Sequence, residues 1–243
     1  MLVDTLLKKY RPLLDLDQNI ILMGYLKHNH HNGRMQSYYT LSEQGQYGYA
    51  YSKEASQTSS FAIDKRAGEL IETHPDRSLQ LAILDSIWEN KVKPTSEIAL
   101  TGLTPKIRAE KRATEILKYI ETHCKTKSII MIGYFVELVR KLQSAHFDVY
   151  CCDADIHMHL PLTEQVYQEI LPHSVLIVSA SYLTRDDFAL ISDKVAQAKY
   201  SILLAQTCSN MIQMHGDAGF DLIFSEVFPP YTLVNSTLRI YST

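Results

Sequence analysis

The chain is poor in several residues and patterns, and each shortage excludes a class of protein. Its 243 residues include only four cysteines, 9 glycines and 8 prolines, and 46% of them are hydrophobic. This is the composition of a globular chain with ample material for a core. No run of about 18 apolar residues is present, so no membrane-spanning helix is expected. The net charge of −3 leaves no basic excess of the kind that binds nucleic acid. We therefore expect neither a membrane nor a nucleic-acid partner.

Several motifs with a known chemistry are also missing. There is no G-x-G-x-x-G fingerprint, which disfavours a pyrophosphate cradled as in dehydrogenases. There is no G-x-S-x-G elbow, so no nucleophile motif supports the interpretation of the protein as a hydrolase. Neither H-E-x-x-H nor a paired C-x-x-C indicates a zinc site. The function has to be argued from side chains that the fold brings together.

The cysteines and the N-terminus bear on where the protein works. Cys124, Cys151, Cys152 and Cys208 lack the spacing of a disulfide framework, which favours a reducing, cytoplasmic location. Residues 1–10 form an amphipathic pattern without the apolar region or cleavage site of a signal peptide.

The first 100 residues predict a small α+β domain. A helix is expected over residues 2–15, followed by strands at Asn19–His28, Met35–Leu41 and Gln46–Tyr51. The Asn32-Gly33 pair between the first two strands favours a tight hairpin turn. Helices are then expected at Asp64–Thr73 and Asp76–Asn90. Trp88, on the apolar stripe of the second helix, is interpreted as a core residue.

The best domain boundary is Lys91–Thr104, which contains Pro94 and Gly102 and has little periodicity. It divides the chain into residues 1–100 and 101–243. Thr104 and Pro105 are typical of a helix start, with threonine at the N-cap and proline in the first turn.

The second part alternates between strand and helix patterns. Continuous apolar runs of this kind indicate strands buried on both faces, and their alternation with helices predicts a parallel sheet with right-handed crossovers. We therefore expect a Rossmann-like domain, with Leu233–Tyr241 as an added edge strand. The strands are expected at Ser128–Ile132, Val149–Cys152, Val175–Val178, Ile202–Ala205 and Leu222–Phe224, and the helices at Phe135–Ser144, Thr163–Leu171, Thr184–Ala198 and Ser209–His215.

Ligands of open α/β sheets bind outside the carboxyl ends of the strands, so the residues at these ends are the candidate cofactor-binding residues. Gly133 could open a helix N-terminus to an anion, or could only permit close packing. Asp153, about twenty residues later, occupies the place of a ribose-binding acid, although such residues also cap helices. Ser209 and Thr184 are interpreted as N-caps. Cys208, just before a helix, could carry a stabilised thiolate. The candidate residues are Gly133, Tyr134, Phe135, Asp153, Ser179, Ser181, Thr207 and Cys208.

Two groups of histidines are candidate metal ligands. Imidazole is the commonest metal ligand, and a divalent transition metal is the candidate cofactor. Because successive residues of a strand point to opposite faces, these histidines could also be exposed loop residues, which is the competing interpretation. The groups are His28, His30 and His31 near the first turn, and His157 and His159 after the second strand of the Rossmann-like domain.

The order of elements resembles a known family. The residues 129–135 (IIMIGYF), Asp153 and the residues 170–179 (ILPHSVLIVS) are similar to the Rossmann-like part of the heavy-metal chelation proteins, a domain of unknown function. The residues 45–50 (GQYGYA) resemble a glycine-containing strand of their first domain. The chain departs from that family at Ser179–Tyr182 and Gln206–Cys208. The resemblance implies an enolase N-terminal-like α+β domain followed by a Rossmann-like domain.

Three hypotheses follow for the function. In the first, the cleft between the domains binds or processes a metal ion, a metal chelate or a small polar metabolite, within metallophore or cofactor biosynthesis. In the second, the strand ends hold a nucleotide-type cofactor such as S-adenosylmethionine or NAD. In the third, the protein is a regulatory module. The first domain also contains tyrosines, which are enriched in protein interfaces, so we expect a homodimer. The same tyrosines could equally pack on helices. They are Tyr38, Tyr39, Tyr47, Tyr49 and Tyr51.

Overall fold

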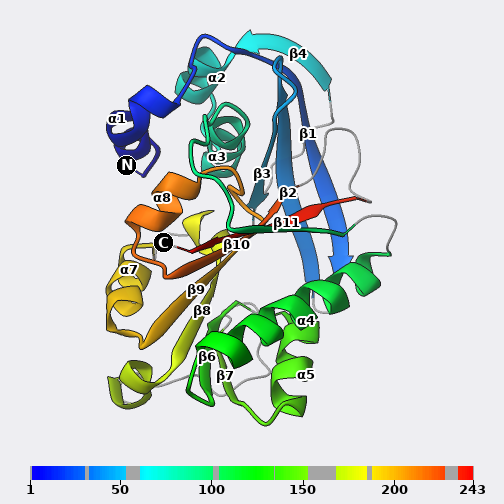
Figure 1. Cartoon of the computed structure of the whole chain (residues 1–243). Helices are drawn as coiled ribbons and strands as arrows, with labels where there is room; N and C mark the ends of the chain where they lie inside the picture. Colours follow the sequence, from blue (N-terminus) through cyan, green and yellow to red (C-terminus); the bar gives the residue numbers. More distant parts are fainter. Residues whose placement is uncertain are drawn as a thin grey trace.

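The computed structural model describes residues 2–30, 33–52, 61–100, 104–133, 135–152, 168–184, 188–227 and 235–242. It contains an α+β unit built on a four-stranded antiparallel sheet, followed by a Rossmann-like unit built on a seven-stranded, mostly parallel sheet. Figure 1 shows the smaller sheet above the ends of the larger one. The fold class predicted from the sequence is confirmed.

The N-terminal unit starts with helix α1 (Leu2–Tyr10) and the short helix η1 (Arg11–Leu13). Its sheet has the order β3-β2-β1-β4. The strands are β1 (Asn19–His30), β2 (Gly33–Ser42), β3 (Tyr47–Ser52) and β4 (Phe61–Arg66), and the helices that follow are α2 (Ala67–Thr73) and α3 (Arg77–Ser86). Trp88, just after α3, is fully buried, as predicted.

Helix α3 packs directly on β3 because of Gly48. A Cβ atom on Gly48 would lie 2.0 Å from the carbonyl oxygen of Ala82 and 2.5 Å from the amide nitrogen of Ser86. Only glycine lets two backbones approach so closely. Consequently the alternate residues Gly48, Ala50 and Ser52 are buried, while the tyrosines between them point to the other face of the sheet.

The second sheet has the order β5-β11-β10-β9-β8-β6-β7. Strands β6 to β10 are parallel, and β11 runs antiparallel to both β10 and β5. The strands are β5 (Ser96–Ala99), β6 (Ser128–Ile132), β7 (Asp148–Cys152), β8 (Val175–Ser179), β9 (Tyr200–Ala205), β10 (Leu222–Val227) and β11 (Thr237–Ser242), and the helices are α4 (Pro105–His123), α5 (Val136–Ser144), η2 (Leu171–His173), η3 (Ala180–Thr184), α7 (Phe188–Gln197) and α8 (Ile212–Asp217).

The two faces of this sheet bury different cores. Helices α4 and α5 cover one face, where Ile116 and Leu142 join the apolar side chains of the strands. On the other face the core is continuous with that of the N-terminal unit, from Leu203 of β9 to Trp88. The two units therefore share one core and are joined by it.

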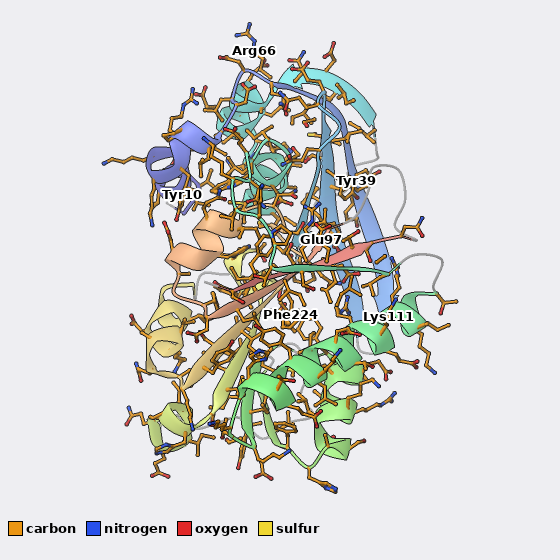
Figure 2. The ribbon with its side chains drawn as sticks, viewed as in Figure 1. Tyr10, Tyr39, Arg66, Glu97, Lys111 and Phe224 are labelled. Atoms are coloured by element: carbon orange, nitrogen blue, oxygen red, sulfur yellow. The ribbon has the colours of Figure 1, made fainter. Side chains whose placement is uncertain are left out.

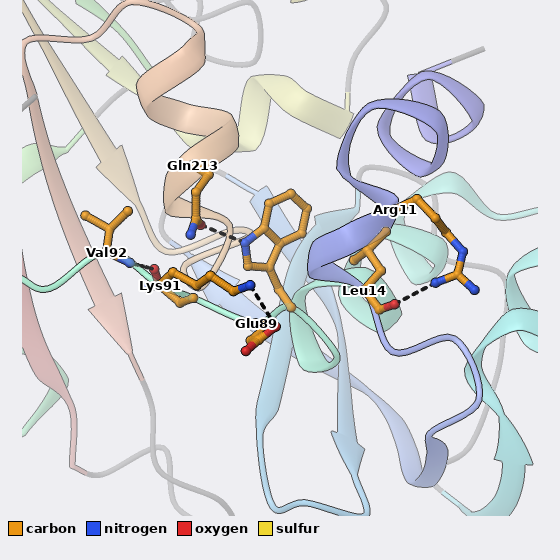
Figure 3. A network of polar contacts seen from close by, with 8 residues as sticks. Arg11, Leu14, Glu89, Lys91, Val92 and Gln213 are labelled. Atoms are coloured by element: carbon orange, nitrogen blue, oxygen red, sulfur yellow. Dashed lines mark hydrogen bonds and ion pairs between the residues drawn. The ribbon is translucent and has the colours of Figure 1, made fainter.

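Helix α8 adds polar contacts to this shared core. The indole Nε1 of Trp88 donates to the side-chain oxygen of Gln213 on α8 at 2.9 Å, and Figure 3 shows Gln213 reaching toward the ring. At the other end of α8, Asp217 accepts the hydroxyl of Tyr10 and pairs with Lys9, each at 2.7 Å. Helix α8 thus ties the Rossmann-like unit to both α1 and the end of α3.

Several predicted elements differ from the observed ones in the N-terminal unit. His30 pairs with Gly33, so Gly33 belongs to β2 rather than to the turn predicted at Asn32-Gly33, and residue 32 lies outside the described residues. The helix predicted from Asp64 begins only at Ala67, because Phe61–Arg66 forms β4 along the free edge of β1. The second helix ends at Ser86 rather than Asn90.

Other differences lie in the Rossmann-like unit. The boundary segment contains β5, which pairs with β11, so the strand predicted at the edge is interior and β5 is the edge. Met211 rather than Ser209 precedes α8 at its N-cap, and Thr184 lies in η3. The helix predicted over Thr163–Leu171 lies mostly outside the described residues. Thr104 caps α4 by accepting the amide of Ile107 at 3.3 Å, as predicted.

Among the described helices, none is long and apolar enough to cross a membrane.

Candidate functional site

The strand order identifies the place where a ligand is expected. Along the sheet, β7-β6-β8-β9-β10 is the order 2-1-3-4-5 of the parallel strands, and the direction of winding reverses between β6 and β8. Crossovers leave the sheet to opposite sides at such a switch point, which opens a crevice at the carboxyl ends of the two strands. The candidate residues Gly133 and Ser179 directly follow or end these two strands.

Gly133 is required for packing at the switch point. Its φ of +99° is rarely adopted by residues with a side chain, and a Cβ atom there would lie 2.7 Å from the Cβ of Ser179. The interpretation of Gly133 as a close-packing residue therefore has direct geometric support. The same turn leads through Phe135 into α5, whose N-cap has no side-chain hydrogen bond. Among the described residues, no side chain caps the first amides of α5.

Two serines complete the switch point. The hydroxyl oxygens of Ser179 and Ser181 are 3.0 Å apart, and both residues keep partial exposure. Together with the N-terminus of α5, these hydroxyls form a group of small hydrogen-bonding partners suited to an anion or a polar ligand.

The end of β9 has a different role from the one predicted. Strand β3 is an edge strand, and the loop after β9 covers that edge. The hydroxyl of Thr207 accepts the amide of Tyr51 at 3.2 Å, and the amide of Cys208 donates to the carbonyl of Tyr49 at 2.9 Å. Thr207 and Cys208 are 3% and 0% exposed. We call this contact of β3 and α3 with the loop at residues 207–210 the junction.

Asp85 is the centre of the junction. This fully buried residue of α3 accepts the amide of Tyr49 at 3.0 Å and the amide of Asn210 at 2.8 Å. The amide of Ser209 also faces its carboxylate. Burial raises the pKa of Asp85 to about 7, and these three backbone amides oppose the shift. One carboxylate therefore joins a helix, a strand and a loop that belong to different units.

Cys208 does not carry a stabilised thiolate, contrary to the expectation from its place before a helix. Burial raises the pKa of its thiol well above the usual value, and the charge of Asp85 adds to the effect. The neighbouring His215 is also buried and donates its Nε2 proton to the carbonyl of Cys208 at 2.8 Å. Burial lowers the pKa of His215 to about 4, so both side chains are neutral at pH 7.

A buried ion pair at the end of β10 was missed by the sequence analysis. Glu226 is 2% exposed and pairs with Arg112 of α4. Its two oxygens also accept the side chains of Gln206 at 2.6 Å and Ser236 at 2.7 Å. Burial would raise the pKa of Glu226, but the charge of Arg112 and these hydrogen bonds hold it below its usual value. Glu226 was recognisable only as a residue at a strand end, and Arg112 only as one of several charges on α4.

The predicted tyrosines lie on both faces of the smaller sheet. Tyr38 is buried against α3 and donates to Asp76 at 2.9 Å. On the opposite face, Tyr39 and Tyr47 stack with their ring centres 5.8 Å apart, and the hydroxyl of Tyr49 lies 2.5 Å from that of Ser37. Figure 2 shows Tyr39 on the smaller sheet, Glu97 and Phe224 on the larger sheet below it, and Lys111 on α4.

The structure describes the predicted metal ligands only in part. His28 and His30 belong to β1, and His31, His157 and His159 lie outside the described residues, as do Tyr134 and Asp153. Within the part of the chain that is described, no group of three histidine, cysteine or acidic side chains could hold a metal ion.

A shallow cavity of about 210 Å³ lies at the opposite end of the strands. It is lined by His123, Cys124, Lys125, Thr126, Lys199 and Tyr200. Burial raises the pKa of the Cys124 thiol to about 11, so this thiol is a poor nucleophile at neutral pH. The end of α4 also turns its negative dipole toward the cavity, which disfavours an anion.

Comparison with solved structures relates this arrangement to known proteins. The chain superposes over its full length on a DUF364-family protein of unknown function from Pyrococcus horikoshii, also over the full length of that chain, with a TM-score of 0.61 and 14% identity. The chain has the DUF364 fold. A second DUF364 protein, from Desulfitobacterium hafniense, matches with a TM-score of 0.55 and 8% identity over 98% of this chain and 96% of the other. No protein family model matches the sequence, and no curated protein matches it. The DUF364 likeness supports a domain of unknown function.

Proposed function

We propose that the protein binds a small polar metabolite with an anionic group at the switch point of the larger sheet. The observation that carries this proposal is the convergence of Gly133, the Ser179 and Ser181 hydroxyls and the uncapped start of α5 at the place where the strand order reverses. Backbone amides at a helix start and neutral hydroxyls stabilise an anion by hydrogen bonds, without a buried counter-charge.

The junction supports the same place for the ligand. Thr207 and Cys208 are hydrogen-bonded to the edge of β3. At the end of β9, Gln206 is therefore the main side chain left to contact a ligand. The segment after β8, η3, also contacts β3 and α3, and Arg77 of α3 donates to its Leu183 carbonyl at 2.9 Å, but Ser179 and Ser181 keep partial exposure. The hydrogen bonds of Asp85 hold the smaller unit in place beside the switch point, where it forms one side of the proposed site.

In one version of this proposal the ligand is a metal ion or a metal chelate, as in metallophore or cofactor biosynthesis, and histidines bind it. This version requires His28, His30 and His31 to meet His157 and His159 near the strand ends. Metal analysis of protein purified without a histidine tag tests it. Absence of a co-purified metal, with no change in thermal midpoint on addition of Zn²⁺, Ni²⁺ or Co²⁺, would reject this version.

A nucleotide-type cofactor is a second candidate, and the strand order favours it. Flavodoxin, a doubly wound sheet of the order 2-1-3-4-5, holds a flavin nucleotide at the same switch point. S-adenosylmethionine or NAD would place its ribose near Asp153. Asp153→Ala should then weaken binding of these nucleotides and leave binding of inorganic phosphate unchanged.

A thermal-shift screen tests the proposed function directly. A ligand that binds only the folded state raises the midpoint by mass action, so phosphate, small di- and tricarboxylates, NAD and S-adenosylmethionine form the panel. A ligand found in this way should lose at least tenfold in affinity in the variant Ser179→Ala/Ser181→Ala. The matched control is Ser128→Ala, at the opposite end of β6. If no member of the panel shifts the midpoint, or if the double variant binds as tightly as the wild type, the proposal is wrong.

A homodimer and a cytoplasmic location remain predictions. Light scattering at several concentrations measures the oligomeric state.

A further inference from the structure

The ion pair at the end of β10 is built to present a guanidinium group. Glu226 is held by donors from three elements: Arg112 from α4, Gln206 from the end of β9 and Ser236 from the start of β11. A carboxylate fixed in this way fixes the guanidinium that pairs with it. Arg112 donates through Nη1, and guanidinium has five donors in a planar fork.

The ion pair with Glu226 leaves the Arg112 side chain partly exposed. Within the described residues, Arg112 pairs with Glu226 through Nη1 and its Nε and Nη2 have no partner, and its side chain is 17% exposed. A guanidinium used only for a structural ion pair is commonly engaged by both of its nitrogens in a bidentate pair. Here one side of the fork faces Glu226 and the rest is left for another acceptor.

The place of this group relates it to the proposed ligand site. Glu226 is the last residue but one of β10, and its charge acts on the phenol of Tyr49, across the junction on β3. Two strand spacings of about 4.8 Å separate β10 from β8, so the backbone of Glu226, the partner of Arg112, is on the order of 10 Å from that of Ser179 along the strand ends. Two anion-binding groups of different chemistry thus lie along one rim.

We propose that Arg112, presented by Glu226, forms a second oxyanion subsite that takes a carboxylate or phosphate group. The ligand class is then a molecule with two acidic groups at its ends, one on Arg112 and one at the switch point. This proposal deepens the proposed function and rests on it for the ligand as a whole, but the subsite on Arg112 is testable alone.

Arginine side-chain NMR provides the test, with inorganic phosphate and succinate as probes. The Nε–H signal of Arg112, assigned by its loss in Arg112→Lys, should shift saturably with either anion, with a dissociation constant in the millimolar range or below. Sodium chloride at equal ionic strength should not reproduce the shift, because it only screens charge. The phosphate and succinate arms separate the two sources of the oxyanion.

Variants separate the subsite from the switch point. Arg112→Lys keeps the charge but loses the planar fork, so backbone amide shifts around Glu226 should require at least fivefold more anion. The double variant Arg112→Gln/Glu226→Gln removes both charges, which avoids an unpaired buried carboxylate, and should abolish these shifts. Lys111→Gln, the adjacent cation on α4, is the matched control and should bind as the wild type does.

Each outcome decides between the two proposals. Loss of anion binding at Arg112 in these variants, with binding retained in Ser179→Ala/Ser181→Ala, supports the subsite. A shift that does not saturate, that chloride reproduces, or that persists in the double charge variant overturns it. If anions bind at Arg112 but Ser179→Ala/Ser181→Ala binds the ligand as tightly as the wild type does, the subsite is retained and the proposed switch-point site is rejected.

Discussion

The carboxylate of Asp85 accepts the backbone amide of Asn210 at 2.8 Å, while the side-chain amide of Asn210 returns a hydrogen bond to the backbone carbonyl of Asp85 at 3.1 Å. This reciprocal pair joins α3 of the N-terminal unit to the loop after β9. A second bond from the Asn210 side chain reaches Tyr47 at 2.8 Å, so the edge of β3 is drawn into the same contact. The junction is therefore polar at its centre and apolar around it.

Replacing Asp85 should loosen the junction. In Asp85→Asn, one carboxylate oxygen becomes an NH₂ group that faces backbone amides, so at least one buried donor loses its acceptor. Unfolding should become easier by about 1–3 kcal/mol, the usual cost of leaving a buried hydrogen-bond donor without its acceptor. Urea unfolding followed by circular dichroism measures this. The control Asp148→Asn, on the exposed start of β7, should change stability by less than about 0.5 kcal/mol; an equal effect in both variants would reject the role of Asp85.

Asp85 and His215 should oppose each other in the pH dependence of stability. The pKa of Asp85 rises to about 7 on folding, so its contribution is largest at low pH and is lost as the pH rises toward 7. The pKa of His215 falls to about 4, so its contribution is present above pH 6.5 and is lost as the pH falls toward 4. Each slope is at most about 1.4 kcal/mol per pH unit.

The two variants should therefore tilt the stability profile in opposite directions between pH 4.5 and 6.5. Relative to the wild type, His215→Gln should lose stability as the pH rises, and Asp85→Asn should gain it. Urea unfolding at three pH values provides the measurement. Parallel profiles for all three proteins would show that neither group titrates differently on folding.

Gly48→Ala should be strongly destabilising. The added methyl group would lie 2.0 Å from a backbone oxygen of α3, and neither backbone can yield without separating α3 from β3. A loss of at least about 3 kcal/mol is expected, at the upper end of overpacking effects. Gly68→Ala is the control, because its nearest neighbour would be 3.3 Å away and alanine favours the helix. Similar midpoints for the two variants would contradict this account.

Gly133→Ala tests the packing of the switch point. Gly45 also has a positive φ, of +82°, but a Cβ atom there meets nothing within 4 Å. Gly45→Ala should cost only the backbone strain of about 1–2 kcal/mol. Gly133→Ala should cost about 1–3 kcal/mol more, because it also meets Ser179.

A double variant isolates that contact. Adding Ser179→Gly to Gly133→Ala removes the opposing Cβ and should recover part of the loss. A double-mutant cycle on the free energy of unfolding measures the coupling. Strict additivity would show that Gly133 and Ser179 do not oppose each other.

Most of the Rossmann-like unit was predictable from local pattern. The five parallel strands were located within a few residues, because strands buried on both faces need continuous apolar runs. Strand β4 was missed, since Phe61–Arg66 carries a mixed, charged sequence and forms only where β1 offers an unpaired edge. Asp85 was missed for a related reason: one acidic residue in an amphipathic helix has the pattern of a solvent-exposed position, and only the fold shows that it is buried.

The Rossmann-like architecture was determined by the sequence alone, through continuous apolar runs that alternate with helix patterns. Which strand ends remain open to a ligand was decided only by the tertiary structure. The reason is that β3 is an edge strand whose unpaired backbone groups need partners, and the loop after β9 supplies them. Thr207 and Cys208 are therefore covered, while Ser179, Ser181 and Arg112 keep partial exposure. No local pattern carries that information, because it depends on contacts between residues more than 100 positions apart.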